Sequence, residues 1–361
     1  MNSSALVTAV IPSYNHEKYI KESIQSMIDQ DYENIEMIII DDGSSDNSIE
    51  IIESMIPLCK KRFKRFEFRH RENKGLCATL NEAIIWANGE YISILASDDI
   101  ALSHKISFLI GKIENSNYPA VFGDIKRIGE RNDKEPNIKE FTIHTFDEIF
   151  TLQNRPFAPS SMYKIEALQK IGGYPVDIAV EDWYMELKFT ENNNKIVSYP
   201  EVLTYYRRHN KNTSKNYELI YNNFIKIVDN YKNHKLYFKA RRLCDIYLIK
   251  ISLANNCLSD TLNMKVEELI SQAKEYSENY NKIAVYGNGT IYNLIKNHIK
   301  NIVAVFDKNQ KEHDIYFKPD KIIITKFDII IITALGYEDD IINFLTINCN
   351  IDINKIKIFD I

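Results

Sequence analysis

Long apolar segments are missing from this chain of 361 residues. The longest apolar run, Ile329–Leu335, is far shorter than the ~20 residues that a helix needs to cross a bilayer. The first residues also lack a basic region followed by an apolar stretch, which argues against a secretory signal. We therefore expect a cytoplasmic protein whose only membrane contact is peripheral, on the inner face of the cell membrane.

Cysteine is scarce, and basic residues are not in excess. The cysteines are odd in number, and no pair has the spacing of a metal or redox motif, which fits a reducing compartment. They are Cys59, Cys77, Cys244, Cys257 and Cys349. The formal net charge of −5 excludes a general nucleic-acid binder, which would be basic, so no nucleic-acid partner is expected.

Length and composition indicate a globular protein with more than one domain. Hydrophobic residues make up 45% and charged residues 26% of the chain, as in folded proteins. A length of 361 residues exceeds an ordinary single core. The apolar pattern predicts an α/β domain at 1–214, a helical linker at 215–280 and a small second α/β domain at 281–361.

Short apolar runs alternate with helix-period segments in the first part of the chain. The expected strands are Val7–Ile11 (closed by Pro12), Glu36–Ile40, Phe66–Arg69 and Tyr91–Leu95. The expected helices are Glu17–Gln30, Ser48–Ile56 and Leu80–Asn88. This alternation predicts a mostly parallel sheet that is covered by helices on both faces.

Acidic residues follow two of these expected strands. Asp41 and Asp42 end one strand, and Asp98 and Asp99 end another. Ligands of such sheets bind at the carboxyl ends of the strands. Carboxylates crowded there need a cation or a hydrogen-bonding ligand to offset their charge, as a divalent ion with a nucleoside diphosphate would provide. The alternative is that Asp-Asp-Gly-Ser only forms a turn.

Five short motifs connect these acidic clusters with a known family. They are VIPSYN at 10–15, IDDGSSD at 40–46, NKGL at 73–76, GEYI at 89–92 and SDD at 97–99. In their order and spacing, residues 7–99 resemble the nucleotide-binding half of family 2 inverting glycosyltransferases with the GT-A fold, and later matches extend the resemblance to about residue 214. It implies a mixed, mostly parallel sheet and transfer of a sugar from a nucleotide-diphosphate donor, with a UDP-sugar favoured.

The resemblance also implies roles for the motif residues. Contacts to the donor nucleotide fall to Pro12, Ser13, Tyr14, Asp41, Lys74 and Asp98. Among these, Asp41 would bind the base and Asp98 the ribose or sugar, and either Lys74 or the adjacent Gly75 backbone would contact the diphosphate. Asp99 would be the direct ligand of Mn²⁺ or Mg²⁺. Many relatives have an arginine where this chain has Leu80, so any donor contact of that arginine is absent or replaced here.

A second cluster consists of a glycine turn, Gly172–Pro175, and the segment Glu181-Asp182-Trp183. Inversion at an anomeric carbon needs a base on the attacking hydroxyl, and a carboxylate also stabilises the oxocarbenium-like transition state. The resemblance assigns the base to Asp182, with Glu181 orienting it or holding the acceptor. Independently of the resemblance, the aromatic ring of Trp183 offers a stacking surface for an acceptor sugar. The alternatives are first-turn helix charges for the acids and ordinary packing for the tryptophan.

A third cluster lies at Tyr205–Asn210. Relatives often have a Tyr-Arg-x-His segment here, which implies that His209 closes over the metal or the diphosphate. Arg207 or Arg208 would bind the diphosphate, since guanidinium groups bind phosphate well. The alternative is an exposed basic loop.

Strand–helix alternation starts again after residue 281. The expected strands are Ile283–Tyr286, Ile302–Phe306, Ile322–Ile324, Ile329–Ile332 and Ile356–Phe359. Gly287-x-Gly289 resembles a dinucleotide fingerprint, which makes the domain Rossmann-like, but Tyr292 takes the place of the third glycine. We expect docking or homodimerisation rather than nucleotide binding. The basic and aromatic stretch 231–250 suits either a solvated helix face or contact with anionic lipid.

These observations favour an inverting, metal-dependent enzyme of EC class 2.4. It would act on a hydroxyl of a saccharide or lipid-linked acceptor, and the resemblance alone implies bacterial surface polysaccharide, lipopolysaccharide or capsule synthesis. A sugar nucleotidyltransferase would need a glycine-rich basic loop where this chain has Ser13–Glu17. A nucleotide-sugar-binding module or scaffold without transfer activity is the other alternative, and the presence of Asp41, Asp99 and Asp182 argues against it.

Overall fold

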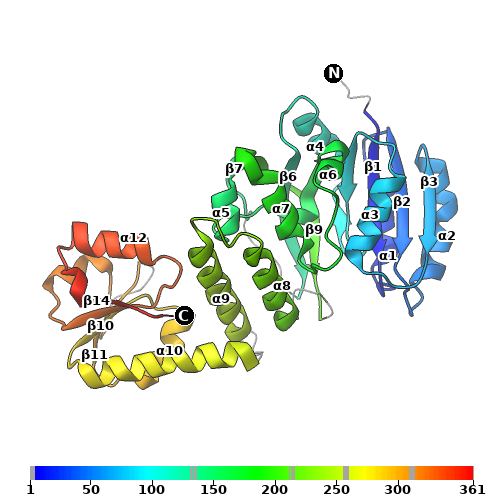
Figure 1. Ribbon diagram of the computed structural model, residues 1–361. Helices are drawn as coiled ribbons and strands as arrows, with labels where there is room; N and C mark the ends of the chain where they lie inside the picture. Colours follow the sequence, from blue (N-terminus) through cyan, green and yellow to red (C-terminus); the bar gives the residue numbers. More distant parts are fainter. Residues whose placement is uncertain are drawn as a thin grey trace. The chain divides into compact units, whose positions relative to one another are not determined.

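The computed structural model describes residues 5–130, 133, 136–210, 212, 216–254, 260–308 and 314–360 (Figure 1). The chain forms two compact units, Met1–Leu236 and Tyr237–Ile361. The expected boundary at residue 214 lies outside the described residues. Helices fill the expected helical segment: α8 (Tyr217–Asp229) belongs to the first unit, and α9 (Tyr237–Ala254) and α10 (Asp260–Asn279) belong to the second.

The first unit contains a nine-stranded sheet among the described residues. Its strands are β1 (Val7–Ser13), β2 (Ile35–Asp41), β3 (Phe66–His70), β4 (Tyr91–Ile94), β5 (Ile100–Ala101), β6 (Ala120–Gly129), β7 (Thr142–His144), β8 (Ser161–Lys164) and β9 (Ile196–Arg208). The order is β3-β2-β1-β4-β8-β6-β9-β5, with β7 paired to β9. Strands β3, β2, β1 and β4 are parallel, and β8 is antiparallel to both its neighbours. This confirms the expected mixed, mostly parallel sheet.

Helices cover the parallel part of the sheet on both faces. The helices that precede α8 in this unit are α1 (Ile20–Ile28), α2 (Ser48–Arg62), α3 (Leu76–Trp86), α4 (Lys105–Ile113), α5 (Phe146–Phe150), α6 (Ile165–Lys170) and α7 (Glu181–Thr190). One apolar cluster joins Ile11 and Ile39 of the sheet to Ile24, Ile52 and Leu109 of α1, α2 and α4. Helix α3 also packs on β1 and β2. Strands buried on both faces explain the nearly continuous apolar runs in the sequence.

Several boundaries differ from those expected because prolines are tolerated at particular places. Pro12 lies inside β1, opposite Ile40 of β2, so the strand continues to Ser13 rather than ending before the proline. Helix α2 continues through Pro57, which is exposed, so the missing amide bond lies on the solvent side. Helix α3 begins at Leu76 because Gly75 precedes it with a φ of +87°.

The second unit contains a parallel sheet in the order β12-β11-β10-β13-β14. Its strands are β10 (Ile283–Tyr286), β11 (Ile302–Phe306), β12 (Tyr316–Phe317), β13 (Ile329–Ile332) and β14 (Ile356–Ile358), and its shorter helices are α11 (Thr290–Ile295) and α12 (Glu338–Asn343). The expected strand at Ile322–Ile324 is wrong. These residues form a 3-10 turn that starts at Pro319, with Ile322 buried and the next two isoleucines exposed.

The basic residues of α9 have partners within the second unit. Lys239 pairs with Asp339 at 2.8 Å and Arg242 with Glu338 at 2.7 Å, while Lys250 donates to the Leu335 carbonyl at 2.7 Å. These contacts lie within the protein, and the alternative of contact with anionic lipid stays untested. Among the described residues, no helix is long and apolar enough to span a membrane.

The turn before α7 is held by a close contact with α3. Gly173 has a φ of +76°, and the Asn81 side chain bonds both the amide of Tyr174 at 2.7 Å and its carbonyl at 2.8 Å. A Cβ on Gly173 would lie 2.5 Å from the Asn81 Oδ1. Gly172 has a φ of +86°, but a Cβ there would meet nothing within 4 Å.

These two glycines form a matched pair for testing the turn. We expect Gly172→Ala to cost only the backbone strain of a positive φ, about 1 kcal/mol. Gly173→Ala adds the clash with Asn81 and should lower the midpoint of thermal unfolding by several degrees more, at about 2–4 °C per kcal/mol. Differential scanning calorimetry measures both, and equal midpoints for the two variants would contradict the proposed contact.

Candidate functional site

A cavity of about 600 Å³ lies where the carboxyl ends of β1 and β4 meet the start of α3. Its lining residues are Pro12, Ser13, Tyr14, Asn15, His16, Asp42, Asn73, Gly75, Leu76, Thr79, Ala96, Ser97, Asp98, Tyr206 and Asn212. The sheet therefore brings Pro12, Ser13, Tyr14 and Asp98 together, as the motifs predicted. Tyr14 is half exposed, so its ring is open to a flat partner. We call this space the donor cavity.

Asp41 is fully buried beside the donor cavity and is held by serines. It lies opposite Ser13 in the β1–β2 register, and its Oδ2 accepts hydrogen bonds from the Ser13 hydroxyl at 2.9 Å and the Ser44 hydroxyl at 2.6 Å. The Ser44 amide donates to its Oδ1 at 2.8 Å. The carboxylate thus fixes the two loops that follow β1 and β2, and a contact to a base stays a prediction.

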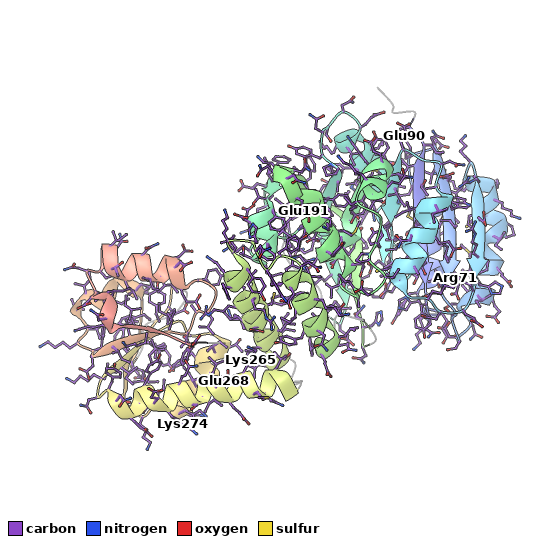
Figure 2. All side chains as sticks on the ribbon, in the orientation of Figure 1. Arg71, Glu90, Glu191, Lys265, Glu268 and Lys274 are labelled. Atoms are coloured by element: carbon purple, nitrogen blue, oxygen red, sulfur yellow. The ribbon has the colours of Figure 1, made fainter. Side chains whose placement is uncertain are left out.

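Asp42 shapes the opposite wall of the donor cavity. It accepts hydrogen bonds from the Lys74 and Gly75 amides, both at 2.9 Å, and it also pairs with Arg71. Arg71, which is labelled in Figure 2, also bonds Glu82 of α3 at 2.9 Å. The structure therefore fixes the backbone of Lys74, while its side chain is not among the lining groups. Sequence reasoning assigned no role to Asp42, although its place after a strand was the available signal.

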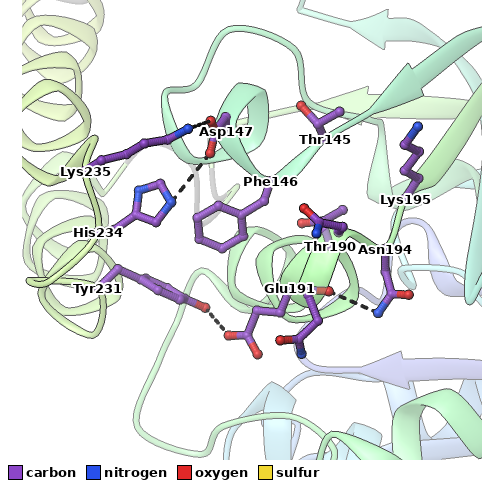
Figure 3. A pocket seen from close by; sticks show the side chains of 12 residues that line it. Thr145, Phe146, Asp147, Thr190, Glu191, Asn194, Lys195, Tyr231, His234 and Lys235 are labelled. Carbon is purple, nitrogen blue, oxygen red and sulfur yellow. Dashed lines mark hydrogen bonds and ion pairs between the residues drawn. The ribbon is translucent and has the colours of Figure 1, made fainter.

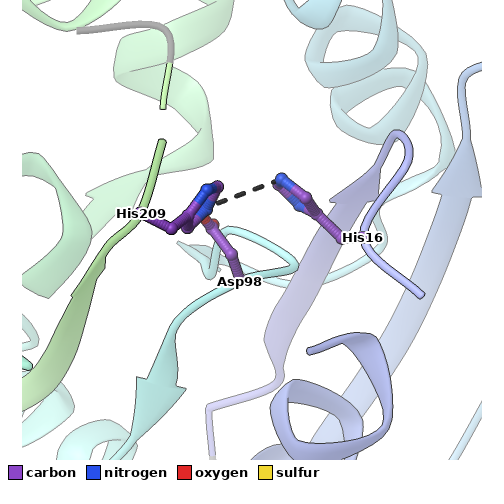
Figure 4. A group of neighbouring side chains, drawn as sticks. All are labelled: His16, Asp98 and His209. Atoms are coloured by element: carbon purple, nitrogen blue, oxygen red, sulfur yellow. Dashed lines mark hydrogen bonds and ion pairs between the residues drawn. The ribbon is translucent and has the colours of Figure 1, made fainter. Parts of the chain in front are cut away.

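Two histidines and an aspartate meet at the edge of the donor cavity (Figure 4). The Nε2 of His209 is 2.9 Å from Asp98 Oδ2, and the Nε2 of His16 is 4.0 Å from the same oxygen. The three ligand atoms all lie within 4.8 Å of one another, which is a spacing that could hold a metal ion. Ser97 bonds the Nδ1 of His16 at 2.7 Å and orients the ring. The sequence did not identify His16 as a site residue, because no local pattern indicates that it lies close to residues 98 and 209 in space.

Asp99 faces away from this group. It is fully buried, and its Oδ1 accepts a hydrogen bond from the Arg207 amide at 2.8 Å. Its Oδ2 has no hydrogen-bond partner among the described residues. Burial and then the neighbouring charge of Asp98 raise the pKa of Asp99 well above its usual range, and burial lowers the pKa of nearby Lys105 to about 7. The residue expected to bind metal thus lies in the core, and Asp98 takes the place beside the histidines.

Arg207 fastens the end of β9 to neighbouring elements. Its Nε donates to the Asp98 carbonyl at 2.9 Å, and its guanidinium pairs with Glu22 of α1. It also lies over the ring of Tyr19, which stacks on His209 with ring centres 5.0 Å apart. This arrangement gives Arg207 a structural task rather than the expected diphosphate contact. The Arg208 guanidinium lies over the ring of Tyr206, which lines the donor cavity.

The acidic pair at the start of α7 sits in a charged network. The Nη2 of Arg155 is 3.3 Å from Asp182 Oδ2, and Arg155 also bonds Glu186 at 2.7 Å. Asp182 keeps about a third of its side chain exposed, at 37%. Burial and the charge of Asp182 raise the pKa of Glu181 to about 8, so at neutral pH Glu181 holds a proton beside an exposed neighbouring carboxylate. The Cys77 thiol donates to the Ile178 carbonyl at 3.3 Å, which places the segment just before α7 beside the first turn of α3.

Trp183 occupies the core rather than the surface. The side chain is fully buried, its indole nitrogen donates to the Ile149 carbonyl at 3.0 Å, and its ring lies 4.5 Å from that of Phe224. A buried ring cannot stack on an acceptor sugar, so these contacts do not support the expected acceptor role. Its function is to anchor α7 and with it the neighbouring acids.

Parallel strands, a cavity at their carboxyl ends and an acidic edge define a nucleotide-binding α/β domain. Residues 8–172 match the family model described as glycosyl transferase family 2. This segment of the chain is therefore similar to a family 2 glycosyltransferase domain.

Two relatives that are similar in sequence are named as a glycosyltransferase and a glucosyltransferase. The glycosyltransferase GlyG of Streptococcus pneumoniae is 38% identical over 122 residues, which are 34% of this chain and 39% of the relative. WfgD of Escherichia coli, a UDP-Glc:alpha-D-GlcNAc-diphosphoundecaprenol beta-1,3-glucosyltransferase, is 28% identical over 52% of this chain and 71% of its own length. The match to GlyG spans well under half of that relative's length.

Solved structures share the fold. Staphylococcus aureus TarS residues 1–349, in complex with UDP-GlcNAc, superposes with a TM-score of 0.56 and 19% identity over 76% of this chain and 79% of that structure. The mannosyltransferase PcManGT of Pyrobaculum calidifontis, with GDP-Man and Mn²⁺, gives a TM-score of 0.54 and 15% identity over 75% and 76%. These likenesses confirm the expected GT-A fold class.

The protonated Glu181 makes stability depend on pH. The native carboxyl keeps its proton up to a pKa of about 8, whereas in the unfolded chain it ionises near 4.5. Between these values the native state binds more protons, so this contribution to stability is lost as the pH rises. We expect the unfolding midpoint of the wild type, relative to that of Glu181→Gln, to fall steadily between pH 5 and 8 in thermal denaturation. A difference that does not change with pH would show that Glu181 is ionised in the native state.

Proposed function

We propose that this protein is an inverting glycosyltransferase that moves a sugar from a nucleotide-diphosphate donor, UDP-linked, to a hydroxyl of a saccharide or lipid-linked acceptor. The observation that carries the proposal is the donor cavity, with a His-Asp-His group at its edge and an exposed carboxylate, Asp182, near the first turn of α3. The UDP-Glc donor and diphosphoundecaprenol acceptor in the name of WfgD, and the UDP-GlcNAc bound by TarS, support the choice of donor and acceptor. A role in bacterial surface polysaccharide synthesis agrees with this choice of donor and acceptor.

The donor cavity suits a nucleoside diphosphate. Tyr14 offers an exposed ring for a base, and Ser13 and Asp41 lie beneath it at the strand ends. The start of α3 places amides at the cavity wall, where a helix N-terminus favours an anion. Arg208 is the cation that we assign to the diphosphate, because its guanidinium lies over the ring of Tyr206, which lines the donor cavity.

The metal group fits Mn²⁺ better than Mg²⁺. Two imidazole nitrogens and one carboxylate are a mixed donor set, whereas Mg²⁺ prefers oxygen ligands alone. We assign the site to His16, Asp98 and His209 instead of Asp99, because the latter is buried and bonded to the Arg207 amide. When bound, the ion would neutralise charge on the departing diphosphate.

Two acids at the start of α7 take part in removing the proton from the acceptor hydroxyl. The acceptor oxygen attacks the anomeric carbon as its proton passes to a carboxylate oxygen of Asp182, and the bond from that carbon to the donor phosphate oxygen breaks to release the nucleoside diphosphate. Arg155 positions Asp182 through the 3.3 Å contact. Glu181 retains its proton, which limits repulsion next to the base and leaves a hydrogen-bond donor for the acceptor.

The two acids can be distinguished by isosteric amides. Asp182→Asn removes the base and should lower kcat by about 10²–10⁴-fold, while UDP binding is unchanged. Glu181→Gln resembles the protonated side chain already present and should retain most of the activity. Release of nucleoside diphosphate in the presence of acceptor gives the rates, and isothermal titration calorimetry gives the UDP affinity. Wild-type turnover by Asp182→Asn would remove this residue from the base role.

The metal assignment is tested by a second matched pair. Asp98→Asn removes the carboxylate that faces the histidines and should weaken Mn²⁺-dependent UDP binding at least tenfold. Asp99→Asn replaces a fully buried carboxyl by an amide of nearly the same shape and should leave this affinity within about twofold. Titration of UDP with Mn²⁺ and with excess chelator provides the comparison. The opposite order of the two variants would restore Asp99 as the ligand.

A further inference from the structure

A second cavity, of about 590 Å³, lies in the first unit and shares no lining residue with the donor cavity (Figure 3). It is lined by Thr145, Phe146, Asp147, Thr190, Glu191, Asn192, Asn193, Asn194, Lys195, Tyr231, His234 and Lys235. Its volume falls within the range of about 300–1,000 Å³ that is typical of small-molecule sites. Three separate chain segments build it, so it is a feature of the tertiary structure.

The two carboxylates of the second cavity are compensated by neighbouring side chains. Asp147 pairs with Lys235 at 2.9 Å and with His234 at 3.5 Å. Glu191 accepts a hydrogen bond from the Tyr231 hydroxyl at 2.8 Å and pairs with Lys188 at 2.8 Å. The carboxylates therefore offer hydrogen-bonding oxygens rather than uncompensated negative charge. A neutral, polar ligand suits this lining better than an ion of either sign.

Aromatic rings and amides complete the second cavity. The ring of Phe146 lies 5.1 Å from that of Tyr231 and 5.0 Å from that of His234, measured between centres. In Figure 3 these rings gather on one side, with Asn194 and Lys195 on the other. Asn, Thr and carboxylate groups match hydroxyls, and aromatic faces match apolar C–H faces. Saccharides present both kinds of surface.

The second cavity is connected to the proposed base by one helix. Helix α7 carries Asp182 in its first turn, and its last residue, Thr190, lines the cavity. The rise of an α-helix places these two residues about 12 Å apart along the axis. An oligosaccharide can bridge that separation, whereas a monosaccharide cannot.

We propose that the second cavity binds neutral sugar units of a glycan acceptor, remote from the hydroxyl that reacts at Asp182. The identification of the bound saccharide as the acceptor rests on the proposed function. Binding of a saccharide in the second cavity does not itself depend on sugar transfer. It predicts that the protein recognises an extended acceptor chain rather than a single terminal sugar.

The test uses two asparagines that already adopt glycine-like backbone angles. Asn192 and Asn193 have φ values of 58° and 64°, so changing both to glycine removes two lining amides without backbone strain. Asn350, exposed in the second unit with a φ of 55°, provides the matched control Asn350→Gly. The full chain is titrated with three probes, the neutral cellohexaose and chitohexaose and an anionic hyaluronan hexasaccharide, by saturation-transfer difference NMR.

We expect at least one neutral hexasaccharide to bind and its Kd to rise about fivefold or more in Asn192→Gly/Asn193→Gly, as the loss of two hydrogen bonds requires. Asn350→Gly should bind as the wild type does. The proposal is overturned if neither neutral probe binds, if the double variant binds equally well, or if only the hyaluronan probe binds. UDP titrations with Mn²⁺ on the same samples separate the two claims, because loss of UDP binding counts against the transferase assignment, whereas a failure of saccharide binding alone counts against the second cavity.

Discussion

Carboxylates crowd one edge of the main sheet, and the first unit depends on how their charge is offset. Asp41 is satisfied by serine hydroxyls and an amide, and Asp42 by two amides and Arg71. Asp98 faces two imidazoles, while Asp99 is buried in a state that favours protonation. Four neighbouring acids thus have four different environments. Among the four, Asp98 is the acid that lies within the His-Asp-His group proposed for a cation.

The two acids of α7 also differ in how their charge is offset by their surroundings. Desolvation holds a proton on Glu181, while Arg155 stabilises the charge of the more exposed Asp182. One carboxyl is therefore suited to donate a hydrogen bond and the other to accept a proton. Trp183, fully buried beside them, anchors the helix that carries both. The helix is positioned in turn by the Gly172-Gly173 turn and its contact with Asn81 of α3.

Much of the architecture could be predicted because it follows from local patterns. Most of β2, Met37–Ile40, is a continuous apolar run, and β10, β11 and β13 were predicted residue for residue. Two predicted elements were wrong: the end of the helix before Pro57 and the strand at 322–324. Pro57 did not end α2, since it faces solvent, and the isoleucines at 322–324 form a 3-10 turn because Pro319 starts one. The expected donor residues Pro12, Ser13, Tyr14 and Asp98 do line one cavity.

The sequence by itself determined the class of fold and the edge where chemistry can occur, because strand periodicity and acids at strand ends are properties of neighbouring residues. Tertiary structure alone decided which acid faces which partner. Asp98 and Asp99 are adjacent in the chain, yet one meets His16 and His209 and the other the amide of Arg207. The reason is geometric: adjacent side chains leave a turn in different directions, and the groups that receive them come from segments about a hundred residues away, which no local pattern encodes.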